Sequence, residues 1–169
     1  MKLQGSCHCG AVHFRLRSAH PYPFNRCYCS ICRKTQGGGG YAINLSGQAA
    51  SLRVEGEEFI SVYQAQVGVA ADGSPEISSA ERRFCKRCGS GLWLWDPRWP
   101  DLIHPFASAI DTELPAAPEH THLMLGSKPE WVPLDSRPQD RCFQEYPEES
   151  IADWHRRLGL EVEVGSGSQ

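Results

Sequence analysis

The sequence predicts a mainly β fold in one domain, and three observations indicate it. Short apolar segments of alternating pattern recur along the chain, turn residues separate them, and eight cysteines stand mostly in clusters. Val12, Phe14 and Leu16 alternate with polar residues within the range 11–17, which is the pattern of a half-buried strand. A chain of 169 residues is long enough for one domain with a proper core.

The other strand candidates are short and lie between turn residues such as Gly37–Gly40 and Asp96-Pro97. Many short strands with frequent turns predict an antiparallel β domain. The candidates are Tyr41–Leu45, Ser51–Val54, Phe59–Ala65, Ile77–Phe84, Gly91–Trp95, Ile103–Ile110, His122–Leu125 and Trp131–Leu134.

One helix is predicted, near the C-terminus. It runs from about Glu148 to Leu158 and ends at Gly159, and Ile151 and Trp154 share one face with Leu158. This apolar face predicts that the helix covers one side of the β core. The domain is therefore expected to span 1–160, and 161–169 is expected to be a disordered tail.

Charge and hydropathy exclude several classes of protein. The formal net charge is −3 and there is no basic tail, which argues against nucleic-acid binding. No apolar run approaches membrane-spanning length, and Cys7 comes too early for a signal peptide. We therefore expect a cytoplasmic protein, and in a reducing compartment clustered cysteines are metal ligands more often than disulfides.

Four cysteines predict a closed metal site. Cys7 and Cys9 have a Cys-x-Cys spacing, and Cys85 and Cys88 a Cys-x-x-Cys spacing. One motif of each kind supplies four thiolates to one zinc ion, the coordination typical of structural sites. The alternative is an exchange of partners, with Cys27 or Cys29 completing the closed site.

Three cysteines, Cys27, Cys29 and Cys32, lie within six residues and predict a second site with one open position. Sites that keep a position for water or substrate are the catalytic type. The fourth ligand could be water, Cys142 or a histidine, although Cys142 reads as an ordinary half-buried thiol, and His120 and His122 read as the outward face of a strand. The candidate histidines are His8, His104, His120 and His122.

The residues after this triplet suggest a ligand site. Arg33 and Lys34 could attract a small anion, or they could form a solvated face. Within the four-glycine run, Gly38 and Gly39 could let a ligand approach the backbone beside the metal, or the run could be a flexible turn.

Three motifs in this order resemble the glutathione-dependent formaldehyde-activating enzyme family. The resemblance covers roughly residues 3–134, and Tyr28 stands where histidine is common in relatives. The motifs are Gly5-Ser6-Cys7-His8-Cys9-Gly10-Ala11-Val12, Cys27-x-Cys29-Ser30-x-Cys32-Arg33-Lys34 and Phe84-Cys85-x-x-Cys88-Gly89-Ser90.

The resemblance implies a mostly β, tent-like zinc fold with two zinc ions. Cys7, Cys9, Cys85 and Cys88 would hold a structural ion, and Cys27, Cys29 and Cys32 a labile ion at the catalytic site. The implied activity is that of a carbon–sulfur lyase that forms S-hydroxymethylglutathione from glutathione and formaldehyde. The alternative is a non-catalytic, zinc-stabilised binding domain or a glutathione carrier, and the sequence does not indicate the oligomeric state.

Overall fold

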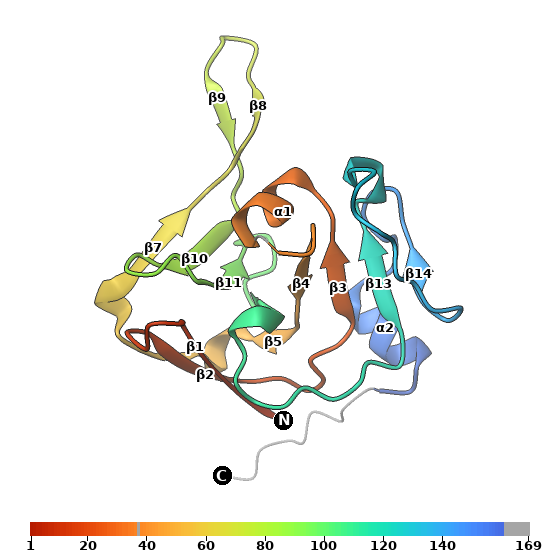
Figure 1. The fold of residues 1–169 in the computed structure, drawn as a ribbon, viewed down its shortest axis with the longest axis horizontal. Coiled ribbons are helices and arrows are strands. Elements are labelled where there is room, and N and C mark those ends of the chain that lie inside the picture. The colour runs from red at the N-terminus through yellow and green to blue at the C-terminus, as the bar shows by residue number, and fades with distance from the viewer. Residues whose placement is uncertain (37, 161–169) are drawn as a thin grey trace.

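The computed structural model describes residues 1–36 and 38–160 and shows a mainly β protein with two α-helices. Figure 1 shows strands around the central helix α1, with α2 at the C-terminal end of the described chain. The predicted fold class is confirmed. The first sheet is antiparallel and has the order β1 (Lys2–Ser6), β2 (His13–Arg17) and β6 (Arg53–Glu55).

The second sheet has five strands, and every pair in it is antiparallel. Buried side chains of this sheet and of the first sheet share one hydrophobic cluster, which includes Leu3, Phe14 and Trp93. The order of the sheet is β5 (Gly47–Gln48), β12 (Leu102–Pro105), β11 (Gly91–Trp95), β10 (Glu81–Cys85) and β7 (Ile60–Tyr63).

The third sheet has two parallel pairings, and the prediction of antiparallel strands fails for these two pairs. β13 runs parallel to both β3 and β14, whereas β3 and β4 are antiparallel. Parallel neighbours need a long connection, and β3 and β13 are separated by most of the chain. The order is β14 (Arg141–Cys142), β13 (His120–Leu123), β3 (Phe24–Cys27) and β4 (Ala42–Asn44).

A two-stranded hairpin, β8 (Gln66–Val69) and β9 (Pro75–Ile77), projects away from the rest of the protein (Figure 1). Its apolar side chains are exposed; Val67 keeps 54% and Val69 64% of its surface accessible. The hairpin therefore contributes little to the core.

The two α-helices differ in how well the sequence predicts them. α2 (Ile151–Arg157) lies within the predicted range and is capped by Ser150, whose side chain accepts a hydrogen bond from the backbone N–H of Asp153. α1 (Ser30–Gln36) was not predicted, because seven residues with one buried side chain give no helical periodicity. The described residues also form four short 3₁₀ segments: Ala49–Ser51, Glu57–Phe59, Ala107–Ala109 and Leu125–Ser127.

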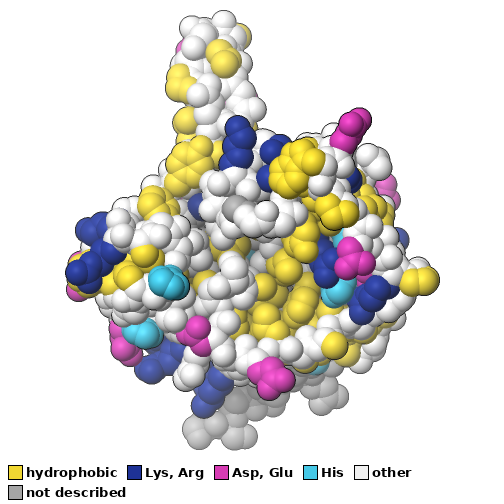
Figure 2. Space-filling model, in the orientation of Figure 1, with side chains coloured by type: hydrophobic (Ala, Val, Ile, Leu, Met, Phe, Trp, Pro, Cys, Tyr) yellow, Lys and Arg dark blue, Asp and Glu magenta, His cyan; other side chains and the backbone are white. Residues whose placement is uncertain are grey.

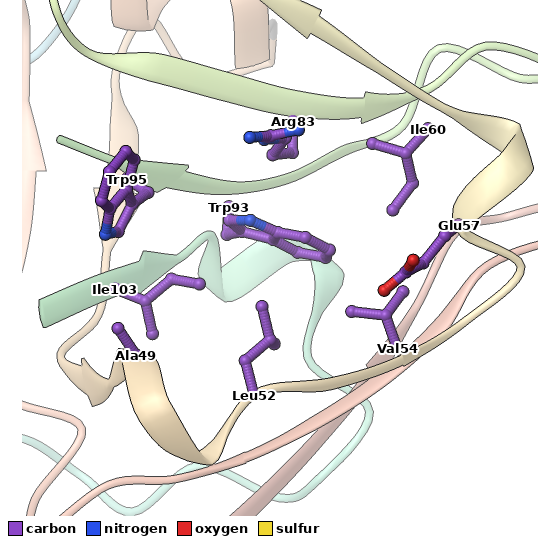
Figure 3. A pocket seen from close by; sticks show the side chains of 9 residues that line it. All are labelled: Ala49, Leu52, Val54, Glu57, Ile60, Arg83, Trp93, Trp95 and Ile103. Carbon is purple, nitrogen blue, oxygen red and sulfur yellow. The ribbon is translucent and has the colours of Figure 1, made fainter. Parts of the chain in front are cut away.

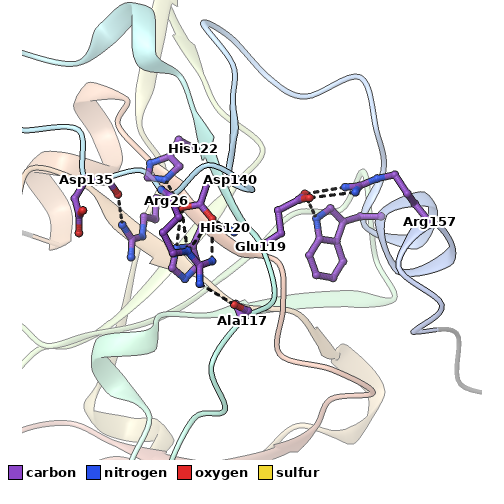
Figure 4. Close-up of polar contacts among 10 residues, drawn as sticks. Arg26, Ala117, Glu119, His120, His122, Asp135, Asp140 and Arg157 are labelled. Atoms are coloured by element: carbon purple, nitrogen blue, oxygen red, sulfur yellow. Dashed lines mark hydrogen bonds and ion pairs between the residues drawn. The ribbon is translucent and has the colours of Figure 1, made fainter.

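The apolar side chain of Trp154 is buried, as predicted, and a buried polar contact in addition attaches α2 to the residue before β13. Trp154 is only 2% exposed, and its indole N–H donates to a carboxylate oxygen of Glu119 at 2.9 Å. Arg157 donates to both oxygens of the same carboxylate, at 2.7 and 3.1 Å. Figure 4 shows the indole and guanidinium groups converging on Glu119.

Most predicted strands are present, with shifted ends, but some predictions are wrong. The range Trp131–Leu134 forms a turn and irregular chain, Ile77–Phe84 is divided between β9 and β10, and the second half of Ile103–Ile110 is a 3₁₀ segment. The predicted disordered tail, 161–169, lies outside the described residues. Within the described ranges, no helix is long and apolar enough to cross a membrane.

Candidate metal centres

The structure brings Cys7, Cys9, Cys85 and Cys88 together, with all four sulfur atoms within 4.8 Å of one another. The Sγ atom of Cys9 lies 3.5 Å from that of Cys7 and 3.8 Å from that of Cys85. Sulfur ligands at ~2.3 Å from a tetrahedral zinc ion lie roughly 3.8 Å apart. The group therefore fits a four-thiolate ion, and neither Cys27 nor Cys29 takes part in it.

Two turns with glycine at positive φ shape this sulfur cluster. Gly10 has φ 72° and Gly89 has φ 75°, a conformation that glycine adopts without steric cost. The backbone N–H of Gly89 donates to the carbonyl oxygen of Cys85 at 2.8 Å, which closes the knuckle. Hydrogen bonds from the Ser90 side chain and backbone lower the pKa of Cys88 to about 5, so this cluster favours a thiolate at neutral pH.

The second sulfur cluster is built where β3 passes into α1. Cys27 ends β3, Cys32 lies in the first turn of α1, and Cys29 lies between them. All three sulfur atoms lie within 4.8 Å of one another. Cys27 and Cys32 are buried, whereas Cys29 is only half-buried, so the cluster is open to solvent on the side of Cys29.

Hydrogen bonding within the triplet concentrates negative charge on Cys29. Hydrogen bonds from Cys27, from Cys32 and from the backbone N–H of Cys32, at 3.4 Å, hold the pKa of Cys29 well below its ordinary value. The same sharing raises the pKa of Cys27, and burial adds to the effect. The triplet therefore holds a ready thiolate, the form of cysteine that binds metals.

Among the described residues, no fourth cysteine, histidine or carboxylate lies within 4.8 Å of all three sulfur atoms. The candidates for a fourth ligand lie elsewhere. His104 hydrogen-bonds the carbonyl oxygen of Leu45 at 3.0 Å, His120 and His122 belong to another group, and Cys142 is exposed. Cys142 is thus more exposed than the half-buried thiol that the sequence indicated.

The predicted ligand-binding residues follow the triplet but differ in their surroundings. Arg33 is half-buried, and its Nε atom is buried without a hydrogen-bond partner, whereas Lys34 is exposed. Gly38 and Gly39 are exposed, and a Cβ atom on Gly38 would meet nothing within 4 Å. Figure 2, in the orientation of Figure 1, shows a hollow floored by apolar side chains on the face toward the viewer.

Behind the triplet lies a buried polar group that the sequence did not reveal. His122 is fully buried, so the prediction that it faces outward is wrong. Its Nδ1 atom lies 3.0 Å from the hydroxyl of Tyr28, and its Nε2 atom lies 3.5 Å from a carboxylate oxygen of Asp140. Strand periodicity could not show this, because both faces of β13 are covered; His120, on the same strand, is only half-buried.

The carboxylate of Asp140 contacts His120, His122 and Arg137 in this polar group (Figure 4). Burial alone would raise the pKa of Asp140, but hydrogen bonds from the guanidinium and backbone N–H of Arg137 outweigh it and hold the pKa far below its usual range. Burial lowers the pKa of both His120 and His122. The carboxylate is therefore charged and the two imidazoles are neutral at pH 7.

One cavity of the protein does not coincide with either sulfur cluster. It has a volume of about 450 Å³ and lies between β6 and the five-stranded sheet (Figure 3). None of the cysteines lines it, so the metal chemistry and the cavity are separate features. Its lining residues are Ala49, Leu52, Val54, Glu57, Ile60, Arg83, Trp93, Trp95 and Ile103.

Comparison with known proteins identifies the family of the chain. The family model of the glutathione-dependent formaldehyde-activating enzyme matches residues 2–125. A Halomonas elongata protein named "Putative glutathione-dependent formaldehyde-activating enzyme" is 66% identical over 161 residues, which cover 95% of this chain and 99% of that protein. A crystal structure of a Rhodobacter sphaeroides protein is 26% identical and has a TM-score of 0.49, covering 68% of this chain and 92% of that chain. The chain belongs to the glutathione-dependent formaldehyde-activating enzyme family.

Proposed function

We propose that the protein is a zinc-dependent carbon–sulfur lyase that joins a thiol such as glutathione to formaldehyde or a similar small electrophile. One observation carries the proposal. A group of three sulfur atoms, for which the described residues supply no fourth ligand, lies in the same domain as a complete group of four. The difference matches the distinction between catalytic and structural zinc sites.

The donor atoms of both clusters suit zinc. Thiolates are soft ligands that select zinc over magnesium or calcium, and the sulfur separations of the four-cysteine group match a tetrahedral ion. Cys7, Cys9, Cys85 and Cys88 would hold a structural ion. Cys27, Cys29 and Cys32 would hold a labile ion that favours the thiolate form of a thiol in the open position.

The reaction forms one carbon–sulfur bond. The thiolate sulfur attacks the carbonyl carbon of formaldehyde, the electron pair of the C=O π bond moves to oxygen, and that oxygen takes up the proton that the thiol had lost. No atom is left over, and no oxidant or reductant is needed. The role of the protein is to bind the thiol, to favour its ionised form and to hold it in the apolar hollow.

Residues next to the triplet would bind the rest of the thiol. Arg33 has a buried Nε–H without a partner, and Lys34 is exposed one residue further along α1. Both are suited to a carboxylate of glutathione through charge-assisted hydrogen bonds. Gly38 and Gly39 lack side chains at the end of this helix, so a ligand can approach their backbone.

The test compares the rate of S-hydroxymethylglutathione formation, followed by NMR exchange spectroscopy, with and without the zinc-loaded protein. We expect the wild-type protein to accelerate exchange between glutathione and formaldehyde. Cys29→Ser should abolish the acceleration and lose one zinc ion with the fold retained. Cys142→Ser is the matched control, because this cysteine is exposed and belongs to neither cluster, and it should behave as wild type.

Two outcomes would contradict the proposal. Exchange that is no faster with zinc-loaded protein than with buffer would leave a zinc-stabilised binding domain or glutathione carrier. Loss of the whole fold in Cys29→Ser would show that the triplet is structural instead.

A further inference from the structure

Arg82 carries a buried positive charge that nothing in the described structure neutralises by direct contact. The residue is only 8% exposed, and its Nε and Nη1 atoms are buried without a hydrogen-bond partner. No described carboxylate forms an ion pair with it, although its neighbour Arg83 pairs with Glu81. A guanidinium group does not lose its proton in proteins, and a buried charge without a partner is costly. Such a group requires an explanation.

The strand register places Arg82 on the side of the catalytic triplet. Arg82 lies opposite Leu94 in the pairing of β10 with β11, and directly opposed residues share one face of a sheet. Leu94 packs against the hydrophobic cluster that contains Cys27 and Cys32.

Arg83, the next residue, lies on the opposite face. It pairs with Trp93 across the strands, and both residues line the cavity on the far side of the sheet (Figure 3). The consecutive residues Arg82 and Arg83 of β10 therefore lie on opposite faces of the sheet. Arg82 is buried on the triplet side, whereas the side chain of Arg83 is 34% exposed on the cavity side.

Compensation of the cysteine charges explains only part of this arrangement. Three thiolates around a divalent ion would leave a net charge of −1, which attracts the cationic side chain of Arg82. The Nε and Nη1 atoms of Arg82 nevertheless form no hydrogen bond with a cysteine sulfur or with any other atom of the described residues. Two unpaired nitrogen donors on a fixed cation are suited to an anionic oxygen, because charge-assisted hydrogen bonds are the strong ones. An oxygen ligand at this place would satisfy the donors that the protein leaves unpaired.

We infer that Arg82 binds a carboxylate of the thiol substrate and makes the site selective for thiols that carry one. The inference rests on the proposed function, because it assumes that a thiol occupies the open position of the triplet. It differs from the roles of Arg33 and Lys34, since Arg82 comes from the five-stranded sheet and not from α1.

The experiment measures thiol binding to the zinc-loaded protein by calorimetry and, separately, turnover. The ligands are glutathione, its diethyl ester, in which both carboxylates are masked, and the neutral thiol 2-mercaptoethanol. In Arg82→Gln the dissociation constant of glutathione should rise about 10- to 100-fold, with 2-mercaptoethanol and the ester unchanged. The dissociation constant of glutathione for Arg82→Lys should lie between those for Arg82→Gln and wild type. Arg83→Gln is the matched control and should bind all three ligands as wild type does.

Equal weakening of all three ligands in Arg82→Gln, or no weakening of any, would overturn the inference. If Arg82→Gln does not fold, Arg82→Lys separates Arg82 from Arg33 and Lys34, because it should still bind glutathione more weakly than wild type does, with 2-mercaptoethanol unchanged. The wild-type protein must in addition bind the diethyl ester at least tenfold more weakly than glutathione. Similar affinity for the two, or no binding of glutathione, would overturn the inference. A wild-type protein that binds glutathione selectively but does not accelerate product formation would contradict the proposed function alone.

Discussion

The Tyr28 hydroxyl lies 3.0 Å from the Nδ1 atom of His122, and neither side chain is accessible to solvent. The contact joins the loop of the cysteine triplet to β13, a strand nearly one hundred residues away in sequence. Asp140 faces the other ring nitrogen, which favours a proton on Nε2 and leaves Nδ1 to accept from the tyrosine. Tyr28 therefore fixes the position of the chain between Cys27 and Cys29.

Replacing Tyr28 with Phe should destabilise the protein by about 1–3 kcal/mol, because the buried Nδ1 atom of His122 would lose its hydrogen bond. The free energy of unfolding, measured in urea, checks this. Tyr63→Phe is the control, since Tyr63 is 45% exposed, and it should change the free energy by less than about 0.5 kcal/mol. A similarly small change for Tyr28→Phe would show that the hydroxyl contributes nothing to stability.

The stability of the protein should fall as the pH is lowered from 7 to 5. Burial lowers the pKa of His122 below its ordinary value of 6.5, so the unfolded chain takes up a proton at a higher pH than the folded protein does. Below pH 6.5 the unfolded state binds more protons and is favoured, by at most about 1.4 kcal/mol per pH unit for one histidine.

Comparison of variants isolates the contribution of His122. The difference in unfolding free energy between pH 7 and pH 5 should be smaller in His122→Asn than in wild type. His13→Asn is the control, because His13 is exposed, and its pH dependence should match wild type. An unchanged slope in His122→Asn would contradict the prediction. The cysteines are the same in all three proteins, so thiolate protonation cancels in the comparison.

Chelation should remove the two predicted zinc ions in two steps. The triplet supplies three ligands and is open near Cys29, whereas Cys7 and Cys85 are buried in the core that joins two sheets. Limited EDTA should therefore take one ion with little change in the circular dichroism spectrum, and the second ion should leave only with unfolding, because binding energy at a structural site is folding energy. Native mass spectrometry and circular dichroism, recorded together, check this order. Simultaneous loss of both ions would contradict it.

The sequence predicts which cysteines lie together better than it predicts which strands and side chains surround them. The spacing within each of the pairs Cys7/Cys9 and Cys85/Cys88 is a local pattern, and the structure confirms that these four lie together. The parallel pairing of β3 with β13 joins segments far apart in the chain, and no local periodicity encodes it. For that reason His122 was expected on an outer face, although the structure buries it completely.

The burial of Arg82 is another feature that local sequence patterns do not predict. A cationic residue beside another arginine and a Cys-x-x-Cys motif is most simply read as part of a solvated face. Only the pairing of β10 with β11 shows that alternation directs Arg82 inward while Arg83 lines the cavity on the other side. Helix α2 is the opposite case, since its apolar face and the glycine that follows it are local features.

Replacing Glu119 with Ala should destabilise the protein by about 1–3 kcal/mol. The carboxylate is the acceptor for the buried indole N–H of Trp154 and for the guanidinium of Arg157, so its loss leaves the indole unsatisfied and loosens α2. Hydrogen exchange at the amides of α2 should increase together with the loss of stability. Glu148→Ala is the control, because Glu148 is exposed, and it should leave the exchange rates unchanged. Unaltered exchange in Glu119→Ala would show that apolar contacts alone hold the helix.

Removal of the projecting hairpin should leave the fold and both sulfur clusters intact. The backbone N–H of Ser78 donates to the carbonyl oxygen of Ala65 at 2.8 Å, so an Asn-Gly turn can join these two residues in place of 66–77. An isolated two-stranded hairpin is marginally stable, and Val67, Val69 and Ile77 are more than half exposed. The free energy of unfolding should therefore change by less than about 0.5 kcal/mol, and the zinc content measured by mass spectrometry should not change. A loss of either zinc ion, or a destabilisation above about 2 kcal/mol, would show that β8 and β9 support the five-stranded sheet through β7 and β10.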